Sequence, residues 1–140
     1  MKAKKVIFSG IQPTGGLHLG NFLGAIKNWR KLQNDTSYDK YTKLFCIVDH
    51  HALSNKFSID HQVLFKTDLA QQTLELTAGL LACGIDPKKC NLFLQNHVPS
   101  HTEFMWLLSC IAPHSWLNRM TQYKDKRTKN SSLGLYSYPV

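Results

Sequence analysis

The sequence has 140 residues, a length that fits one domain or part of one. Hydrophobic residues make up 43% and charged residues 19%, which is typical of a soluble globular chain and not of a disordered one. Lysine and arginine exceed aspartate and glutamate by 17 − 9 = 8, so a polyanionic partner or a phosphate-rich ligand is favoured. No apolar run approaches the roughly 18 residues needed to span a bilayer, so we expect no membrane segment.

The cysteines and histidines show no metal-binding spacing. The four cysteines are Cys46, Cys83, Cys90 and Cys110. None forms a Cys-x-x-Cys pair, so we expect reduced, buried thiols and a reducing compartment. No carboxylate or cysteine stands at ligand spacing from His97, His101 or His114, and we therefore predict no metal site. No secretory signal is visible at the N-terminus.

The first half of the chain alternates between predicted strands and a helix. Residues 6–8 are apolar and predict a buried first strand, and a Pro-Thr-Gly-Gly loop follows at 13–16. Apolar residues then recur at helical spacing, which predicts an amphipathic helix from about 20 to 33. Residues 34–43 are polar and loop-like. The continuous apolar run at 44–48 is typical of a parallel strand buried on both faces.

The second half continues the alternation. A long helix is predicted over roughly 61–82, and Gly84 is placed to end it. Residues 91–95 are a third strand candidate. Residues 100–103 have the spacing of a capping box, which predicts a helix start, and Pro113 is expected to interrupt the helical pattern. The order strand, helix, strand, helix, strand predicts an α/β fold with a Rossmann-like parallel sheet and flanking helices.

The segment from Phe8 to Asn21 carries the chemistry. A strand ends, a glycine-bearing loop turns and a helix begins, and a helix N-terminus offers unpaired N–H groups to a phosphate. The helix dipole contributes only about 0.3 to 2 kcal/mol, so side chains must add to it. Gly10 and Gly20 lack a Cβ and allow close approach, and His18 can donate to a phosphate oxygen. The segment is not Gly-x-Gly-x-x-Gly, and by itself it is equally compatible with a structural turn.

A family resemblance makes this segment more informative. Residues 9–15 (SGIQPTG) and 18–21 (HLGN) resemble the first signature of class I aminoacyl-tRNA synthetases, in the bacterial and organellar tryptophanyl form. Asn21 stands where many class I members have a second histidine. Further stretches resemble the same family in the same order: CIVDHHA at 46–52, CGIDP at 83–87, RMTQYKDK at 119–126 and GLYSYP at 134–139.

The resemblance implies that residues 1–140 are a partial nucleotide-binding catalytic domain. Residues 1–99 would form the first βαβαβ half, and 100–140 a helical insertion leading to a tryptophan pocket. Family segments that bond the indole N–H, carry a mobile lysine loop or read the anticodon are expected further on, so the chain is expected to be a truncated isoform, an incomplete gene model or an expressed fragment. Alone, it is not expected to charge tRNA at a useful rate.

The resemblance also assigns residue roles. The catalytic residues would be His18, Asn21 and Lys126, the last a mobile lysine that meets pyrophosphate. The ATP and adenylate contacts would be Gly10, Gln12, His18, Gly20 and Asn21. The amino-acid pocket would be lined by Phe8, Gly10, Val48, His51 and Tyr138. His50 stands where a glutamine is usual, which leaves the role of that position open.

Several of these assignments have plain alternatives. Phe8 and Val48 would face the core of any parallel sheet. His51 could be a satisfied loop histidine. Lys124 and Lys126 could belong to a solvated basic face.

The implied activity is the ATP-dependent activation of tryptophan to tryptophanyl-adenylate, followed by transfer to tRNA(Trp). ATP is the nucleotide, Mg²⁺ travels with it, and the full-length family form is a homodimer. The compartment would be the mitochondrial matrix in a eukaryote or the cytoplasm in a bacterium. Two alternatives stay open: a small nucleotidyltransferase, and a non-catalytic fragment that binds nucleotide or RNA.

Overall fold

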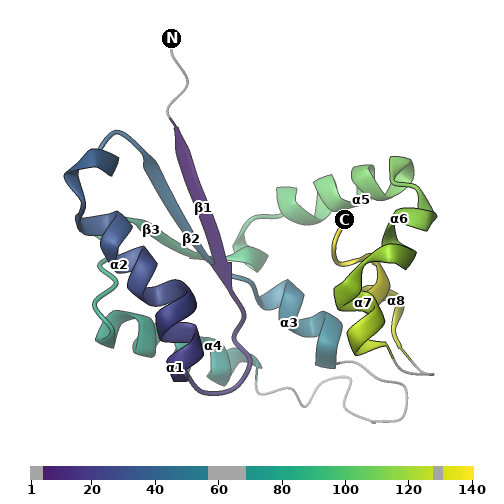
Figure 1. Cartoon of the computed structure of the whole chain (residues 1–140), viewed down its shortest axis with the longest axis horizontal. Coiled ribbons are helices and arrows are strands. Elements are labelled where there is room, and N and C mark those ends of the chain that lie inside the picture. Colours follow the sequence, from purple (N-terminus) through teal and green to yellow (C-terminus); the bar gives the residue numbers. More distant parts are fainter. Residues whose placement is uncertain (1–4, 57–68, 128–130) are drawn as a thin grey trace. The chain divides into compact units, whose positions relative to one another are not determined.

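The computed structural model describes residues 5–56, 69–127 and 131–140, except the side chains of residues 55, 56, 122 and 126. The chain divides into two compact units, Met1–Asp49 with Asp68–His97 and His50–Thr67 with Val98–Val140. All described strands belong to the first unit, and the described part of the second unit is helical (Figure 1).

The first unit is built on a three-stranded parallel sheet. Its strands are β1 (Val6–Ile11), β2 (Thr42–Ile47) and β3 (Asn91–Leu94), in the spatial order β1-β2-β3. Gly10 pairs with Cys46 across the first two strands. The parallel α/β sheet predicted from the alternating pattern is therefore confirmed. β2 begins two residues earlier than the apolar run predicts, because Thr42 and Lys43 already pair with β1.

The connection from β1 to β2 is helical but not uniform. It consists of α1 (Leu19–Asn21), the π-helical segment η1 (Phe22–Ile26) and α2 (Lys27–Asn34). The Lys27 N–H bonds to the Phe22 carbonyl, five residues back, as in a π-helix. The helix predicted over 20–33 is confirmed in place, but apolar spacing reports the buried face and not the backbone hydrogen bonding, so the wider turn was not predictable. A short 3₁₀ turn, η2 (Thr36–Tyr38), precedes β2.

The core of the first unit centres on a stacked aromatic pair. The rings of Trp29 and Phe45 lie 4.4 Å apart at 6°, and both side chains are buried. Trp29 Nε1 donates to Ser9 Oγ at 2.9 Å, so the polar end of the indole is satisfied. Full burial of such side chains stabilises the fold by about 1.5 to 3 kcal/mol each. The pair therefore ties α2 to β2 and, through Ser9, to β1.

The described helix that leads into β3 is α4 (Leu69–Ala82). Its buried residues are Thr73, Leu76 and Leu80, which lie on one face of the helix. The beginning of the predicted helix, 61–68, lies outside the described residues.

Gly84 ends α4 as predicted. Its φ is +89°, in the left-handed region that favours glycine. The Ile85 N–H bonds to the Leu80 carbonyl at 3.0 Å and the Gly84 N–H to the Leu81 carbonyl at 2.9 Å. This is a Schellman cap, which satisfies two carbonyls at the helix end and turns the chain toward β3.

The helices that lie partly or wholly in the second unit are α3 (Asp49–Lys56), α5 (Ser100–Ile111), α6 (His114–Arg119), α7 (Thr121–Lys126) and α8 (Leu133–Ser137). Tyr136 joins three of them. Its hydroxyl donates to the His114 carbonyl at 2.9 Å, and its ring lies 4.9 Å from the His114 ring and 5.0 Å from the Tyr123 ring. Desolvation, and secondarily Tyr123, raises the pKa of Tyr136, so the phenol stays protonated as a donor.

The start of α5 corrects one prediction. The helix begins at Ser100 as expected, but the capping box does not form. The N-cap is Pro99, which has helical dihedral angles, and its carbonyl accepts the Thr102 and Glu103 N–H groups. Because the chain enters the helix already in the helical region, the Ser100 side chain is not at the capping position.

The free cysteines follow the expected burial in part. Cys46 and Cys90 are buried and Cys83 is half-buried, but Cys110 is exposed. The prediction of a buried thiol is wrong at Cys110 because that residue lies on α5, which buries none of its residues in this chain. Among the described residues, no helix is long and apolar enough to cross a membrane.

Candidate functional site

The turn after β1 is shaped by a proline and a glycine. Pro13 is fully buried and anchors the loop, while Gln12 is half-buried. Gly15 has a φ of +72°, so its backbone requires glycine. At Gly16 φ is not positive, and an added Cβ would meet nothing within 4 Å. Two adjacent glycines thus differ: one is demanded by the turn and the other is not.

His18 and Asn21 cap the helix that follows the turn. Gly20 N–H donates to His18 Nδ1 at 3.1 Å, and His18 N–H donates to Asn21 Oδ1 at 3.1 Å. These reciprocal bonds form a capping box with histidine in the place of serine or threonine. A nitrogen that accepts a hydrogen bond carries no proton, so the neutral imidazole bears its proton on Nε2. The exposed ring therefore presents an Nε2–H donor to solvent or to a ligand.

Gly10 and Gly20 leave room for protein side chains. An added Cβ at Gly20 would lie 3.0 Å from both Cε1 and Nδ1 of His18, and one at Gly10 would lie 2.8 Å from Val48 Cγ1. The close approach expected at these two glycines is therefore made by protein side chains in this structure, the His18 imidazole at Gly20 and Val48 at Gly10. Because Gly20 has no Cβ, the His18 ring can lie directly against it.

One face of the sheet gathers the first three predicted pocket residues. Phe8 and Gly10 alternate with Ser9, so they lie on the opposite face of β1 from the Trp29 contact. Phe8 is 56% exposed in this chain. Val48 directly follows β2, is half-buried and packs over Gly10. Phe8, Gly10 and Val48 therefore form an apolar surface beside the carboxyl ends of β1 and β2.

In the second unit, His51 and Tyr138 lie against one another. Their rings are 5.2 Å apart at 79°, an edge-to-face contact. His51 lies in α3 and not in a loop, so the loop-histidine alternative is wrong about its location. Lys126 ends α7, and its side chain lies outside the described residues. Lys124 is exposed, as a solvated basic face requires.

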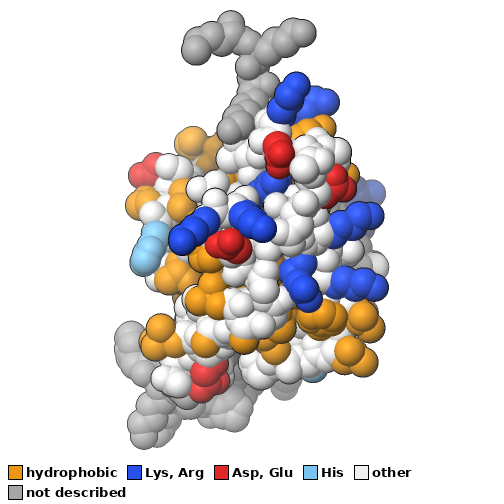
Figure 2. Space-filling view, turned by 90° about the vertical axis from the view of Figure 1, so that its left-hand side faces the viewer, with side chains coloured by type: hydrophobic (Ala, Val, Ile, Leu, Met, Phe, Trp, Pro, Cys, Tyr) orange, Lys and Arg blue, Asp and Glu red, His pale blue; other side chains and the backbone are white. Residues whose placement is uncertain are grey.

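The electrostatics favour anions, and burial keeps the Cys46 thiol protonated. Figure 2 shows Lys and Arg side chains spread over one side of the molecule, together with Asp and Glu side chains, and the chain carries a net charge of +8. Burial, with a smaller contribution from Asp49, raises the pKa of Cys46 to about 11, so this thiol beside Gly10 stays protonated at neutral pH. Among the described residues, no group of three or more His, Cys, Asp or Glu side chains could hold a metal ion.

Comparison with known proteins identifies the family. A family model described as tRNA synthetases class I (W and Y) matches residues 1–140. The chain belongs to the class I tRNA synthetases of the W and Y type. It is 50% identical to the tryptophan–tRNA ligase of Clostridium perfringens over 98% of this chain and 39% of that protein. It is 47% identical to the chloroplastic/mitochondrial tryptophan–tRNA ligase of Arabidopsis thaliana over 97% of this chain and 31% of that protein.

The fold of this class I synthetase chain is also found among solved structures. It is similar to the tryptophanyl-tRNA synthetase of Campylobacter jejuni complexed with ADP and tryptophane, with a TM-score of 0.78, 37% identity and coverage of 96% of this chain and 39% of that one. The chain thus spans about two fifths or less of the lengths of these relatives. A family match along the whole chain argues against the small nucleotidyltransferase alternative.

Sequence reasoning on this class I synthetase chain missed a role for Asp49. Its carboxylate is buried, and its Oδ1 accepts the Asn96 N–H at 3.1 Å. Asn96 belongs to η3 (Gln95–His97), the 3₁₀ turn after β3, so Asp49 ties together the ends of β2 and β3. The available signal was an acidic residue directly after a buried strand and at the start of a helix.

Proposed function

We propose that this chain supplies the ATP-binding part of a tryptophan–tRNA ligase. The observation that carries the proposal is the His18 imidazole, held by the Gly20 N–H with its Nε2–H outward at the turn after β1. It occurs in a chain 46 to 50% identical to proteins named tryptophan–tRNA ligase. A similar solved structure named as a complex with ADP and tryptophane supports one nucleotide site and one amino-acid site.

The nucleotide-side residues act on the phosphates. His18 Nε2–H donates to a phosphate oxygen of ATP, a contact to a charged group worth about 1.5 to 3 kcal/mol. Asn21 accepts the His18 N–H and so holds the His18 backbone, and Gly20 leaves the space that the imidazole occupies. Gln12 and the Gly10 backbone contact the nucleotide or the adenylate. Lys126 meets the pyrophosphate as it leaves.

The amino-acid side is assigned unit by unit. In the first unit, Phe8, Gly10 and Val48 contact tryptophan through the apolar surface that they form. In the second unit, His51 and Tyr138 are assigned to the amino acid by the family resemblance. Edge-to-face contact between these two rings holds each in a defined orientation, which favours recognition of a planar side chain.

The proposed chemistry is nucleotidyl transfer. A carboxylate oxygen of tryptophan attacks the α-phosphorus of ATP, the bond to the bridging oxygen breaks, and pyrophosphate leaves with its charge. Such a step depends on positioning and charge neutralisation more than on covalent catalysis by the protein. Mg²⁺ enters as part of the ATP substrate. The adenylate then passes its tryptophanyl group to a hydroxyl of tRNA(Trp), the bond between the acyl group and the phosphate breaks, and AMP leaves.

Association with a second copy is part of the proposal. Large apolar side chains on α5 and α6 are exposed in this chain: Phe104, Trp106, Leu107, Ile111 and Trp116. Exposed aromatic clusters of this kind mark protein interfaces. We assign this surface to a homodimer contact. The compartment follows the source, a mitochondrial matrix in a eukaryote or the cytoplasm of a bacterium, since the relatives include bacterial and organellar proteins.

Titration calorimetry with a non-hydrolysable ATP analogue tests the nucleotide site. The His18→Ala chain is expected to bind about tenfold or more weakly than the unmodified chain. His97→Ala is the matched control, because His97 is an exposed histidine of the same unit and lies outside the turn. Equal affinities for the unmodified and His18→Ala chains remove His18 from the phosphate site.

A further inference from the structure

A polar cavity of about 560 Å³ lies in the first unit, away from the nucleotide turn. It is lined by residues 33 and 34 at the end of α2, by residues 39 and 41–43 before and at the start of β2, and by residues 87–91 before and at the start of β3. Because the strands are parallel, the amino ends of β2 and β3 lie at one end of the sheet, and the carboxyl end of β1, which leads into the turn, lies at the other. The cavity is therefore separate from the proposed ATP site.

Lys43 brings a buried positive charge to this cavity. It is 5% exposed and lies on the same face of β2 as Phe45 and Ile47, so its aliphatic stem continues the core. Among the described residues, the one carboxylate within 4.0 Å of its Nζ is Asp39, whose Oδ1 is 4.0 Å away. A close charge-assisted hydrogen bond measures about 2.7 to 2.9 Å. Asp39 is 68% exposed, so water screens this pair and leaves the Lys43 charge only partly balanced.

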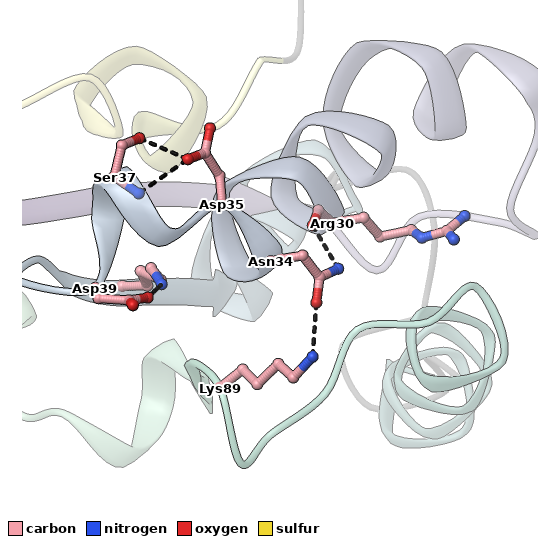
Figure 3. A network of polar contacts seen from close by, with 7 residues as sticks. Arg30, Asn34, Asp35, Ser37, Asp39 and Lys89 are labelled. Atoms are coloured by element: carbon pink, nitrogen blue, oxygen red, sulfur yellow. Dashed lines mark hydrogen bonds and ion pairs between the residues drawn. The ribbon is translucent and has the colours of Figure 1, made fainter.

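A second ammonium group is held in place at the same cavity. Lys89 Nζ donates to Asn34 Oδ1 at 2.7 Å, and Asn34 Nδ2 donates to the Arg30 carbonyl at 2.8 Å (Figure 3). Asn34 is thus oriented by the helix and in turn orients Lys89. The ammonium keeps two further N–H donors beyond the one given to Asn34. Lys88 adds a third lysine to the lining.

The charges define the ligand. The lining holds three lysines and one carboxylate, Asp39, so its formal charge is 3 − 1 = +2. Asp86 lies beside it, but its Oδ1 accepts the Lys88 N–H at 2.9 Å. A phosphate monoester carries about −1.5 to −2 at neutral pH, whereas each phosphodiester of a nucleic acid carries −1. The cavity volume lies within the roughly 300 to 1,000 Å³ of small-molecule sites.

We propose that this cavity binds the phosphate monoester group of a small phosphorylated molecule, and that Lys43 and Lys89 meet its oxygens. The buried Lys43 on β2 and Lys89 in the turn before β3 supply donors from two segments, and Asn34 ties Lys89 to the end of α2. Binding in this cavity does not involve the ATP site, so this proposal can fail while the proposed function holds, and the reverse.

The test is nuclear magnetic resonance on the ¹⁵N-labelled chain titrated with ribose 5-phosphate, with inorganic phosphate and a short single-stranded RNA in separate arms. The amides of Thr42, Cys90 and Asn91 report on the cavity, and that of Gly20 reports on the nucleotide turn. Both small phosphates are expected to shift the three cavity amides in a saturable way. Shifts at Gly20 alone, or cavity shifts with RNA alone, overturn the proposal.

Variants locate the charges. Lys43→Met keeps the buried stem and removes the ammonium, and it is expected to weaken ribose 5-phosphate binding by about tenfold or more. Lys89→Met removes the second donor from the surface and is expected to weaken binding by a similar factor, which keeps the test decisive if Lys43→Met does not fold. Lys27→Met, an exposed lysine of α2 outside the lining, is the matched control and should bind within twofold of the unmodified chain. Wild-type affinity in Lys89→Met, or in a folded Lys43→Met, contradicts the proposal.

Discussion

Substitution of Gly20 by alanine separates the role of the His18 ring from the stability of the helix. The new Cβ would lie 3.0 Å from both Cε1 and Nδ1 of the imidazole, closer than an ordinary van der Waals contact of 3.4 to 4 Å. The ring is the movable partner, and moving it away from the new Cβ strains the 3.1 Å bond between Nδ1 and the Gly20 N–H. Loss of a helix cap costs about 1 kcal/mol, but alanine gains up to about 1 kcal/mol over glycine in a helix. The free energy of unfolding should therefore change little.

Nucleotide affinity should change much more. With the imidazole displaced, Nε2–H no longer points at the phosphate, and the loss of about 1.5 to 3 kcal/mol corresponds to a tenfold to hundredfold weaker Kd for an ATP analogue. Calorimetric titration gives the Kd, and urea unfolding followed by circular dichroism gives the stability. Gly16→Ala is the matched control in the same turn, because its Cβ meets nothing within 4 Å and its φ is not positive. It should bind within twofold of the unmodified chain. Equal affinities for the two alanine variants would refute the reasoning that the His18 ring needs a residue without a Cβ at position 20.

Three further predictions concern the core, the thiols and the apolar surface. Trp29→Ala removes the stack and the bond to the β1 hydroxyl and is expected to lower the free energy of unfolding by about 3 to 5 kcal/mol in urea titration; a loss under 1 kcal/mol would contradict the core assignment. At pH 8 a thiol reagent should modify exposed Cys110 and spare Cys46, and equal labelling of the two thiols would contradict the burial of Cys46. Because the pKa of Cys46 is raised in the folded chain, the contribution of this thiol to stability is full below pH 9 and is lost as the pH rises to about 11. In a full-length relative carrying this segment, Trp106→Ala and Trp116→Ala should lower the dimer mass seen by light scattering at low concentration; an unchanged mass in both would remove these rings from the contact.

The strands and helices of the first unit were predictable because each is carried by a strong local pattern. The apolar run at 44–48 is typical of a buried strand, and Gly84 was well placed to end a helix because glycine readily adopts the positive φ of a helix cap. The burial of Lys43 was not predictable, since a lysine before an apolar run is usually solvated. Its position depends on the register with β1, which the sequence of a single strand does not contain.

The two capping segments show why the site was only partly predictable. Ser100 with Glu103 has the residue types of a capping box, yet the chain enters that helix through Pro99 and no box forms. His18 with Asn21 lacks the usual residue types, yet forms one. Capping depends on backbone dihedral angles at one position, which composition alone does not determine. The family resemblance pointed to His18, but only the hydrogen bond to Nδ1 reveals which ring nitrogen carries the proton.

The most direct test of the central claim is tryptophan-dependent exchange of labelled pyrophosphate into ATP. These 140 residues would replace the matching segment of the Clostridium perfringens ligase, to which they are 50% identical, so that the rest of the enzyme is supplied by the relative. The chimera is expected to catalyse exchange with tryptophan and not with tyrosine, and His18→Ala within it should reduce kcat/KM by about tenfold to hundredfold. A folded chimera that binds ATP but catalyses no tryptophan-dependent exchange, or one that is indifferent to His18→Ala, would contradict the account.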